Sequence, residues 1–275
     1  MRPTILLLSV LLFSLASAPS ARASAQEGGL PQGRTWTLGP FSIVEQILSA
    51  GEEGYGPEMS LRFQHQGRDL FDPVEGTIFE PRVRGPLADT PRPGCSALWT
   101  TTYSGGAHCC FEDIVLITCP DKDLVVRINL ADSEAGDLTT KGRLAVLPLT
   151  DWGMSYYGPA SAPDLFLPFA SSPAFNRFLV FDPDGPRPDR PGEFPGFHAN
   201  ERAEAERGGE NGLSTTMAMI AAYHAYMING DREAARQVLL KYLREPWLSA
   251  ADTVLEDIVK AADGFDPAKV QVFAK

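Results

Sequence analysis

The residues best able to do chemistry gather between Cys95 and Cys119, a stretch that contains all four cysteines of the 275-residue chain. Two of them, Cys109 and Cys110, are adjacent and follow His108. An imidazole with two thiolates could bind a soft metal such as zinc, and adjacent thiols could exchange disulfides. Both uses lack their usual spacing, because zinc thiolates are commonly separated by two to four residues and redox pairs form Cys-x-x-Cys at a helix start. We therefore expect no bound metal, no cofactor and no catalytic residue here.

A structural use of the cysteines is better supported. In an oxidising compartment, an even number of cysteines first predicts disulfides. If a hairpin turn is centred on Ala107, residues whose numbers sum to 214 lie opposite each other, so Cys95 faces Cys119 and can bridge to it. Cys109 and Cys110 would then form a strained vicinal bridge. The two arrangements that pair Cys95 and Cys119 each with one of the adjacent cysteines avoid this strain and remain open.

The turn between the two halves of this stretch is the candidate contact site for a ligand. It comprises Tyr103, Ser104, Gly105, Gly106 and His108. The octapeptide YSGGAHCC (103–110) resembles the signature of a group of exported bacterial proteins of unknown function related to FG-GAP-type β-propeller repeats. Residues 169–174 are similar to a segment that follows in that group, so the resemblance covers about residues 95–182. It implies export and a propeller-like fold, and it supplies no catalytic residue. The chain keeps only residues 182–185 of the group's calcium-type turns, which offer too few oxygen ligands for calcium.

Segments with the alternating, β-branched and aromatic residues of strands surround the cysteines. We expect strands at residues 35–48, 59–66, 76–83, 97–103, 110–118, 123–130 and 144–149. In the second of these, Met59, Leu61 and Phe63 should point to one side of the strand. The prolines at 86, 91 and 93 predict an irregular connection before the hairpin. Short strands separated by turns predict a mainly β fold, propeller-like or a sandwich sheet array, with a C-terminal α-helical segment.

Composition divides the chain into four parts. Residues 1–25 combine Arg2, a short apolar run and small residues, which predicts a secretory signal peptide. Residues 26–181 form the β-rich domain, and residues 182–198, rich in proline, glycine and charge, are predicted to be a linker. Residues 199–275 should form a small helical domain, because their apolar residues recur with a helical period.

Three helices are expected in the last part, at residues 213–228, at 232–243 and from the capping pattern at 249–252 to about 262. Asn229, Gly230 and Asp231 should end the first helix and cap the second. A capping box from Ser249 to Asp252 should open the third. Joined by short turns, these helices predict a small antiparallel bundle.

Other polar and aromatic residues are weaker candidates. Asp151, Trp152, Tyr156 and Tyr157 form an aromatic loop that could stack on a sugar or peptide, although packing in the core is the commoner use of such residues. The other three histidines are expected at a strand end, in the linker and on the apolar face of a helix: His65, His198 and His224.

The net charge of the mature chain limits the classes of partner that it can bind. Without the signal peptide, the chain has 22 basic and 35 acidic residues, a net charge of −13. Nucleic acids and anionic lipid surfaces are bound through clustered Lys and Arg, so we expect no nucleic-acid partner and no membrane insertion after signal cleavage. We place the chain in the periplasm or outside the cell. The sequence favours a non-enzymatic binding or structural module with an unknown protein or small-molecule partner. The alternative is a thiol-disulfide or metal-dependent enzyme centred on the His-Cys-Cys turn.

Overall fold

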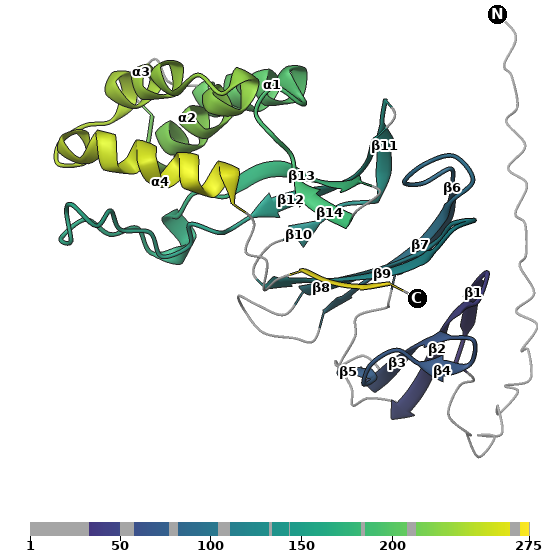
Figure 1. Cartoon of the computed structure of the whole chain (residues 1–275). Coiled ribbons are helices and arrows are strands. Elements are labelled where there is room, and N and C mark those ends of the chain that lie inside the picture. The colour runs from purple at the N-terminus through teal and green to yellow at the C-terminus, as the bar shows by residue number, and fades with distance from the viewer. Residues whose placement is uncertain are drawn as a thin grey trace, which may run out of the picture.

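The computed structural model describes residues 33–49, 58–76, 82–103, 111–131, 134–142, 144–182, 185–207, 213–264 and 270–274. In these ranges the chain is mainly β, with three antiparallel sheets and a helical segment near the C-terminus (Figure 1). The predicted fold class is confirmed at this level. The described strands neither close into a barrel nor form the blades of a propeller, so the propeller-like alternative has no counterpart in them. The predicted signal peptide, residues 1–25, lies outside the described residues.

Each sheet is built from strands that are near one another in the sequence, apart from the last strand of the chain. Sheet A contains β1 (Thr35–Leu38), β2 (Phe41–Ser49), β3 (Glu58–His65), β4 (Arg68–Asp69) and β5 (Val74–Gly76). Sheet B contains, in spatial order, β15 (Val270–Ala274), β9 (Asp123–Ala131), β8 (Phe111–Thr118), β7 (Ser96–Tyr103) and β6 (Arg82–Ala88). Sheet C contains β10 (Glu134–Ala135), β11 (Thr139–Lys141), β12 (Leu144–Asp151), β13 (Phe175–Asp182) and β14 (Gly185–Pro188).

Sheet B lies between the other two sheets. Ile114 and Leu116 on one face of β8 belong to the core shared with sheet A, which includes the predicted inward residues of β3. Val115 and Ile117 on the other face belong to the core shared with sheet C. A strand buried on both faces has no position for a solvated side chain, which explains the continuous apolar run Ile-Val-Leu-Ile in β8.

The hairpin of β7 and β8 has the predicted register. Ser96 pairs with Thr118, and the pairing continues in step to Tyr103 and Phe111. Cys95 and Cys119 lie immediately outside the first pair and form a disulfide, which is the pairing that hairpin geometry favoured among the three left open by the sequence.

Replacing both Cys95 and Cys119 with alanine should lower the free energy of unfolding by about 3 kcal/mol, because the bridge closes a loop of about 25 residues in the unfolded chain. Urea unfolding of the mature protein without reductant measures this change. A control variant with alanine at Ser96 alone alters the adjacent cross-strand pair without opening the loop or removing the Thr118 hydroxyl, and it should cost less than about 1 kcal/mol. Equal losses in the two variants would contradict a stabilising role of loop closure.

Four helices follow the sheets: α1 (Pro195–Glu206), α2 (Thr215–Asn229), α3 (Arg232–Tyr242) and α4 (Ala251–Asp263), the last preceded by a 3-10 turn at Trp247–Ala250. Among the described residues, no helix has both the length and the apolar character needed to cross a bilayer. The junction of α2 and α3 is as predicted, because Gly230 ends α2 with a φ of 79° and the Asp231 side chain accepts from the Ala234 amide at 3.0 Å. The predicted capping box at Ser249 is wrong. Its hydroxyl donates to Glu245 at 2.6 Å, and α4 begins without a side-chain cap.

The proline-rich segments are more regular than the sequence suggested. In the predicted linker, residues 182–198, β14 pairs with β13 and α1 begins at Pro195. Before the hairpin, β6 pairs with β7 and shifts register between Arg84 and Leu87, where Pro86 lies. Both strands are edges of their sheets, where a missing backbone N–H is tolerated, and the first turn of a helix also accepts proline.

The helices pack on the part of sheet C that sheet B leaves uncovered. Phe178 of β13 contacts Phe194 and Phe197, with ring centroids 4.8 and 4.5 Å apart. Phe175 at the start of β13 stacks on Tyr223 of α2 at 4.2 Å. As a result, the helices gather at the end of the molecule farthest from sheet A (Figure 1).

Candidate functional site

The predicted contact turn lies mostly beyond the described residues. Tyr103 ends β7 and pairs with Phe111 through the backbone. The other candidates of the turn fall outside the described ranges: Ser104, Gly105, Gly106, His108, Cys109 and Cys110. A contact role for this turn, and the enzyme alternative centred on it, stay predictions.

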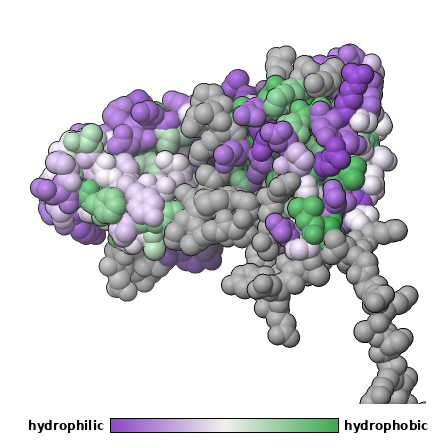
Figure 2. Space-filling view, turned by 90° about the horizontal axis from the view of Figure 1, so that it is seen from below, coloured by the Kyte–Doolittle hydropathy of each residue, from purple (hydrophilic) through white to green (hydrophobic). Residues whose placement is uncertain are grey.

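A row of stacked rings occupies the connection between β12 and β13, residues 152–174, which we call the aromatic loop. Trp152 stacks on Phe169 at 4.8 Å, Phe169 lies 5.6 Å from Tyr156, and Tyr156 lies 6.5 Å from Phe166. The last two side chains project into solvent, since Tyr156 is 55% and Phe166 58% exposed. The loop runs beneath α4 in Figure 1, and hydrophobic surface appears on the helical end when the molecule is viewed from below (Figure 2).

The aromatic loop is held in one conformation by its own hydrogen bonds. The Leu167 amide donates to the Tyr157 carbonyl at 2.7 Å, and the buried Ser172 hydroxyl donates to the Leu167 carbonyl at 3.1 Å. The two arms approach so closely that a Cβ at Gly158 would lie 2.7 Å from the Leu165 carbonyl oxygen. Only glycine fits there, so the position of the rings is built into the backbone.

Adjacent tyrosines of the aromatic loop have opposite roles. Tyr157 is buried, and its hydroxyl donates to Asp257 of α4 at 2.8 Å. Burial and the Asp257 carboxylate raise the pKa of Tyr157. The predicted packing role therefore holds for Tyr157. Tyr156 instead points outward with a φ of 54°, a backbone conformation that costs a bulky residue on the order of 1 kcal/mol or more and is concentrated at functional sites.

A buried cation joins sheet C to the helices. Arg177 of β13 has a side chain that is 1% exposed and donates to Asp189 at 3.3 Å and to Asp151 at 3.5 Å. It also donates to the carbonyls of Ala261 and Ala262 near the end of α4, at 2.9 and 3.0 Å. Burial by itself would lower the pKa of the guanidinium, but its surroundings, including both carboxylates, raise it. A cation at a helix C-terminus is favourable, so Arg177 fixes α4 on the sheet.

Two buried histidines extend the hydrogen-bond network from Asp189. Its second oxygen lies 3.0 Å from Nε2 of His198 in α1, and Nδ1 of His198 lies 2.9 Å from Nδ1 of His224 in α2. The carboxylate fixes a proton on His198 Nε2, and a second proton lies between the two Nδ1 atoms. Burial and the neighbouring His198 lower the pKa of His224 to about 3. Both rings are fully buried, so the core role predicted for His224 is confirmed, and His198 belongs to the same network rather than to a linker.

The third described histidine bridges two sheets. His65 Nε2 lies 3.0 Å from Asp123 of β9, whose other oxygen accepts from the Thr118 hydroxyl at 2.7 Å. A hollow of about 420 Å³ beside it is lined by His65, Gln66, Arg68, Asp69 and Leu70. The aspartate orients the ring, but the pair links sheets A and B and has a structural use there.

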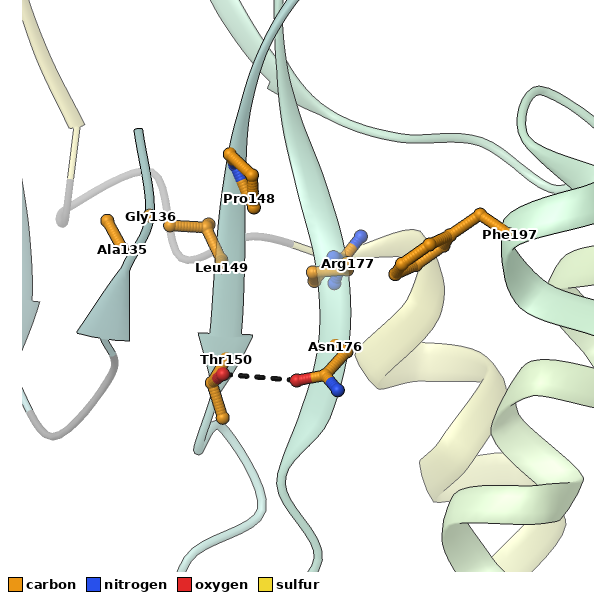
Figure 3. A pocket seen from close by; sticks show the side chains of 8 residues that line it. All are labelled: Ala135, Gly136, Pro148, Leu149, Thr150, Asn176, Arg177 and Phe197. Atoms are coloured by element: carbon orange, nitrogen blue, oxygen red, sulfur yellow. Dashed lines mark hydrogen bonds between the residues drawn. The ribbon is translucent and has the colours of Figure 1, made fainter. Parts of the chain in front are cut away.

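A second hollow, of about 310 Å³, lies on sheet C beside α1 (Figure 3). Phe197 points into it from the helix, opposite Pro148 and Leu149 of β12. Its polar groups already have partners, because Asn176 accepts from the Thr150 hydroxyl at 3.0 Å and donates to Glu201 at 2.7 Å. This hollow is therefore an apolar depression with few groups able to take part in a reaction.

One buried carboxyl that the sequence analysis missed is placed differently. Asp113 of β8 is fully buried, and in the described part of the chain neither of its oxygens has a hydrogen-bond partner of good geometry, although the Thr101 hydroxyl is near enough to lower its pKa. Burial raises its pKa to about 7, against the smaller opposing effects of Thr101 and Arg84. Buried polar groups normally have partners, so an unpaired carboxyl with a raised pKa marks a candidate site. The signal in the sequence is the pair of acids, Glu112 and Asp113, that opens an apolar strand. Adjacent side chains point to opposite faces, so at least one of the two must face a core.

The described ranges hold no group of three or more His, Cys, Asp or Glu side chains suited to a metal. Asp182, from the calcium-like turn, accepts from Arg187 at 2.5 Å. Comparisons of the chain with protein-family models, curated proteins and solved structures found no match. The function therefore has to be argued from geometry.

Proposed function

We propose that this chain is an exported, non-enzymatic binding module that holds a protein partner on the exposed rings of the aromatic loop. The observation that carries the proposal is the outward Tyr156, held at a positive φ beside the equally exposed Phe166. Large exposed aromatic side chains that are already ordered lose little conformational entropy on binding, and such residues dominate the affinity of protein interfaces.

The length and order of the aromatic loop support this role. The only helix or strand in the loop, all of whose residues the structure describes, is a 3-10 turn at Phe169–Ser171. Ordered connections longer than about 12 to 15 residues with so little secondary structure are uncommon and usually functional. Here the connection is anchored on both sides, by the Tyr157 contact with Asp257 and by a hydrogen bond from Thr216 of α2 to the Ser171 carbonyl. These anchors make the ring positions independent of any ligand.

The packing of the rings favours a protein over a sugar. Trp152 and Phe169 are inclined by 17°, and Tyr156 and Phe166 by 23°, whereas Phe169 and Tyr156 are tilted by 45°, so the rings form two stacked pairs. Sugars stack on open ring faces, whereas stacked pairs offer mainly ring edges. Edges that project from a surface fit a cleft in a partner protein.

Export is part of the proposal. It rests on the signal-peptide pattern of residues 1–25, and the disulfide of Cys95 and Cys119 is consistent with an oxidising compartment such as the periplasm.

Replacing Tyr156 and Phe166 with serine should abolish partner binding, because two interface rings contribute about 2 kcal/mol or more each. Photo-crosslinking tests this in envelope fractions of the source organism, with the photoreactive residue at Ser155 in both the wild type and the double variant. The expected result is one dominant crosslinked protein that falls by at least about tenfold in the double variant. Leu240→Ser, which removes a 36% exposed apolar residue on α3, is the matched control and should leave the crosslink unchanged. The same crosslink in all three proteins would refute the proposal.

A further inference from the structure

We propose a second site on the chain, in which Asp113 and Thr101 bind the primary ammonium group of a small molecule. The two residues lie directly opposite each other in the pairing of β8 with β7. Opposite residues on one face have Cβ atoms about 5 Å apart, so their side-chain oxygens can contact one guest. This site is separate from the aromatic loop and does not depend on the protein-binding role proposed above.

The unpaired atoms define what the guest must supply. Both oxygens of Asp113 and the Thr101 hydroxyl oxygen are buried, and none has a hydrogen-bond partner of good geometry among the described residues. The Thr101 hydroxyl is near enough to donate to Asp113, and the lone pairs that remain on these three oxygens can accept from the three N–H donors of an ammonium group. Trp99, two residues before Thr101 on the same face, has an indole N–H that is also buried and unpaired within the described ranges. A guest that carries an acceptor beside its ammonium group satisfies that donor too.

The charge of the guest follows from the surroundings of Asp113. Ile128 faces it from β9 and is fully buried, so the carboxyl lies in the apolar core between sheets B and C. Below about pH 7 a proton neutralises the carboxyl. Above that pH a water molecule supplies donors but no charge, whereas a cation balances the buried carboxylate. The nearby cation of the chain, Arg84, donates instead to Asp137. The other charged neighbour, Glu112, points the opposite way and accepts from Arg127.

The proposed route to the site is from the start of β8. The side chain of Asp137 in the Arg84 ion pair is 72% exposed, which places that pair at the rim of the core. Asp113 lies two residues from the start of β8, and the ends of strands open more easily than their middles. In this proposal, local opening of that strand end admits a small guest to the fully buried Asp113 without unfolding of the sheet.

The test uses ethanolammonium, which carries a hydroxyl acceptor, and choline, which has the same skeleton and charge but no N–H donors. The unfolding midpoint of the mature protein is followed at pH 8 and constant ionic strength as each compound is added. We expect a saturable rise with ethanolammonium and none with choline, because a ligand of the folded state alone stabilises it by mass action. Equal responses to the two cations, or no saturable response because the site holds internal water only, would overturn the proposal.

Variants assign the response to these residues. Asp113→Asn should raise the apparent dissociation constant for ethanolammonium by at least about tenfold, and Thr101→Val by several-fold. Thr101→Val keeps the shape of the side chain, so it stays informative if Asp113→Asn does not fold. Thr100→Val is the matched control, since Thr100 is buried on the opposite face and its hydroxyl is likewise without a described partner. An affinity as sensitive to Thr100→Val as to Thr101→Val would contradict the assignment.

Discussion

Replacing Arg177 with methionine should lower the free energy of unfolding by about 3 to 5 kcal/mol, because the change removes one member of a buried ion network and leaves the rest in place. Asp189 is fully buried beside the guanidinium, and Asp151 is nearly so. Without Arg177 both carboxylates lose their counter-charge, and the last carbonyls of α4 lose a donor. Methionine fills similar volume, so the loss reports on charge and hydrogen bonds more than on a cavity.

Urea unfolding with hydrogen exchange read by mass spectrometry measures both the loss and its place. Relative to the wild type, we expect Arg177→Met to speed amide exchange in α4 more than in β8, since Arg177 connects α4 to sheet C. Arg187→Met is the matched control, because Arg187 also contacts two carboxylates, those of Asp182 and Glu193, but near the surface. It should cost about 1 kcal/mol or less. Similar losses for the two variants would mean that the buried Arg177 network contributes no more to stability than an ion network near the surface.

The β hairpin could be predicted in detail because its information is local. Residues whose numbers sum to 214 pair between β7 and β8, as expected from a single turn in the sequence, and that register places Cys95 beside Cys119. The Gly230 and Asp231 junction was predictable for the same reason, since helix caps depend on neighbouring residues. In both cases the deciding contacts span few residues or follow from one turn.

The buried network could not be predicted, because its members come from six separated segments of the chain. Arg177, Asp189 and His198 each look like solvated residues in their own segment, and His198 appeared to lie in a linker. The regular structure of residues 185–198 has the same origin. β14 forms because β13 offers it an edge, and α1 because the sheet offers Phe178 as a packing surface. A composition rich in proline and charge does not reveal that the edge of β13 or the Phe178 surface is available for packing.

The aromatic loop was predicted in part. The sequence identifies the aromatic residues but not which of them point outward. Tyr156 and Tyr157 are adjacent, yet one is 55% and the other 8% exposed. The difference is set by the Asp257 contact and by the close approach at Gly158, both of which depend on residues brought together by folding.

In buffers without primary amines, Asp113→Asn should be more stable than the wild type at pH 8 and should lose about 4 kcal/mol of that advantage by pH 4. The pKa of Asp113 is about 7 in the folded protein and 3.8 ordinarily. Between these values the folded state holds a proton that the unfolded state has released, so stability falls as pH rises, by about 1.4 kcal/mol per unit. Asparagine has no such proton, and the cost of burying its amide is the same at both pH values.

The titration of His224 changes the free energy of unfolding in the opposite direction over nearly the same pH range. Its pKa is about 3 in the folded protein and 6.5 ordinarily, so its contribution is present above pH 6.5 and is lost as pH falls toward 3. In the wild type the two slopes oppose each other between about pH 4 and 6.5. Asp113→Asn leaves the His224 slope, so stability should fall on acidification. His224→Asn, which keeps a polar group at the position of Nδ1, leaves the Asp113 slope, so stability should rise. Urea unfolding of the three proteins from pH 4 to 8 separates these effects, and parallel profiles would mean that neither group changes its proton binding on folding.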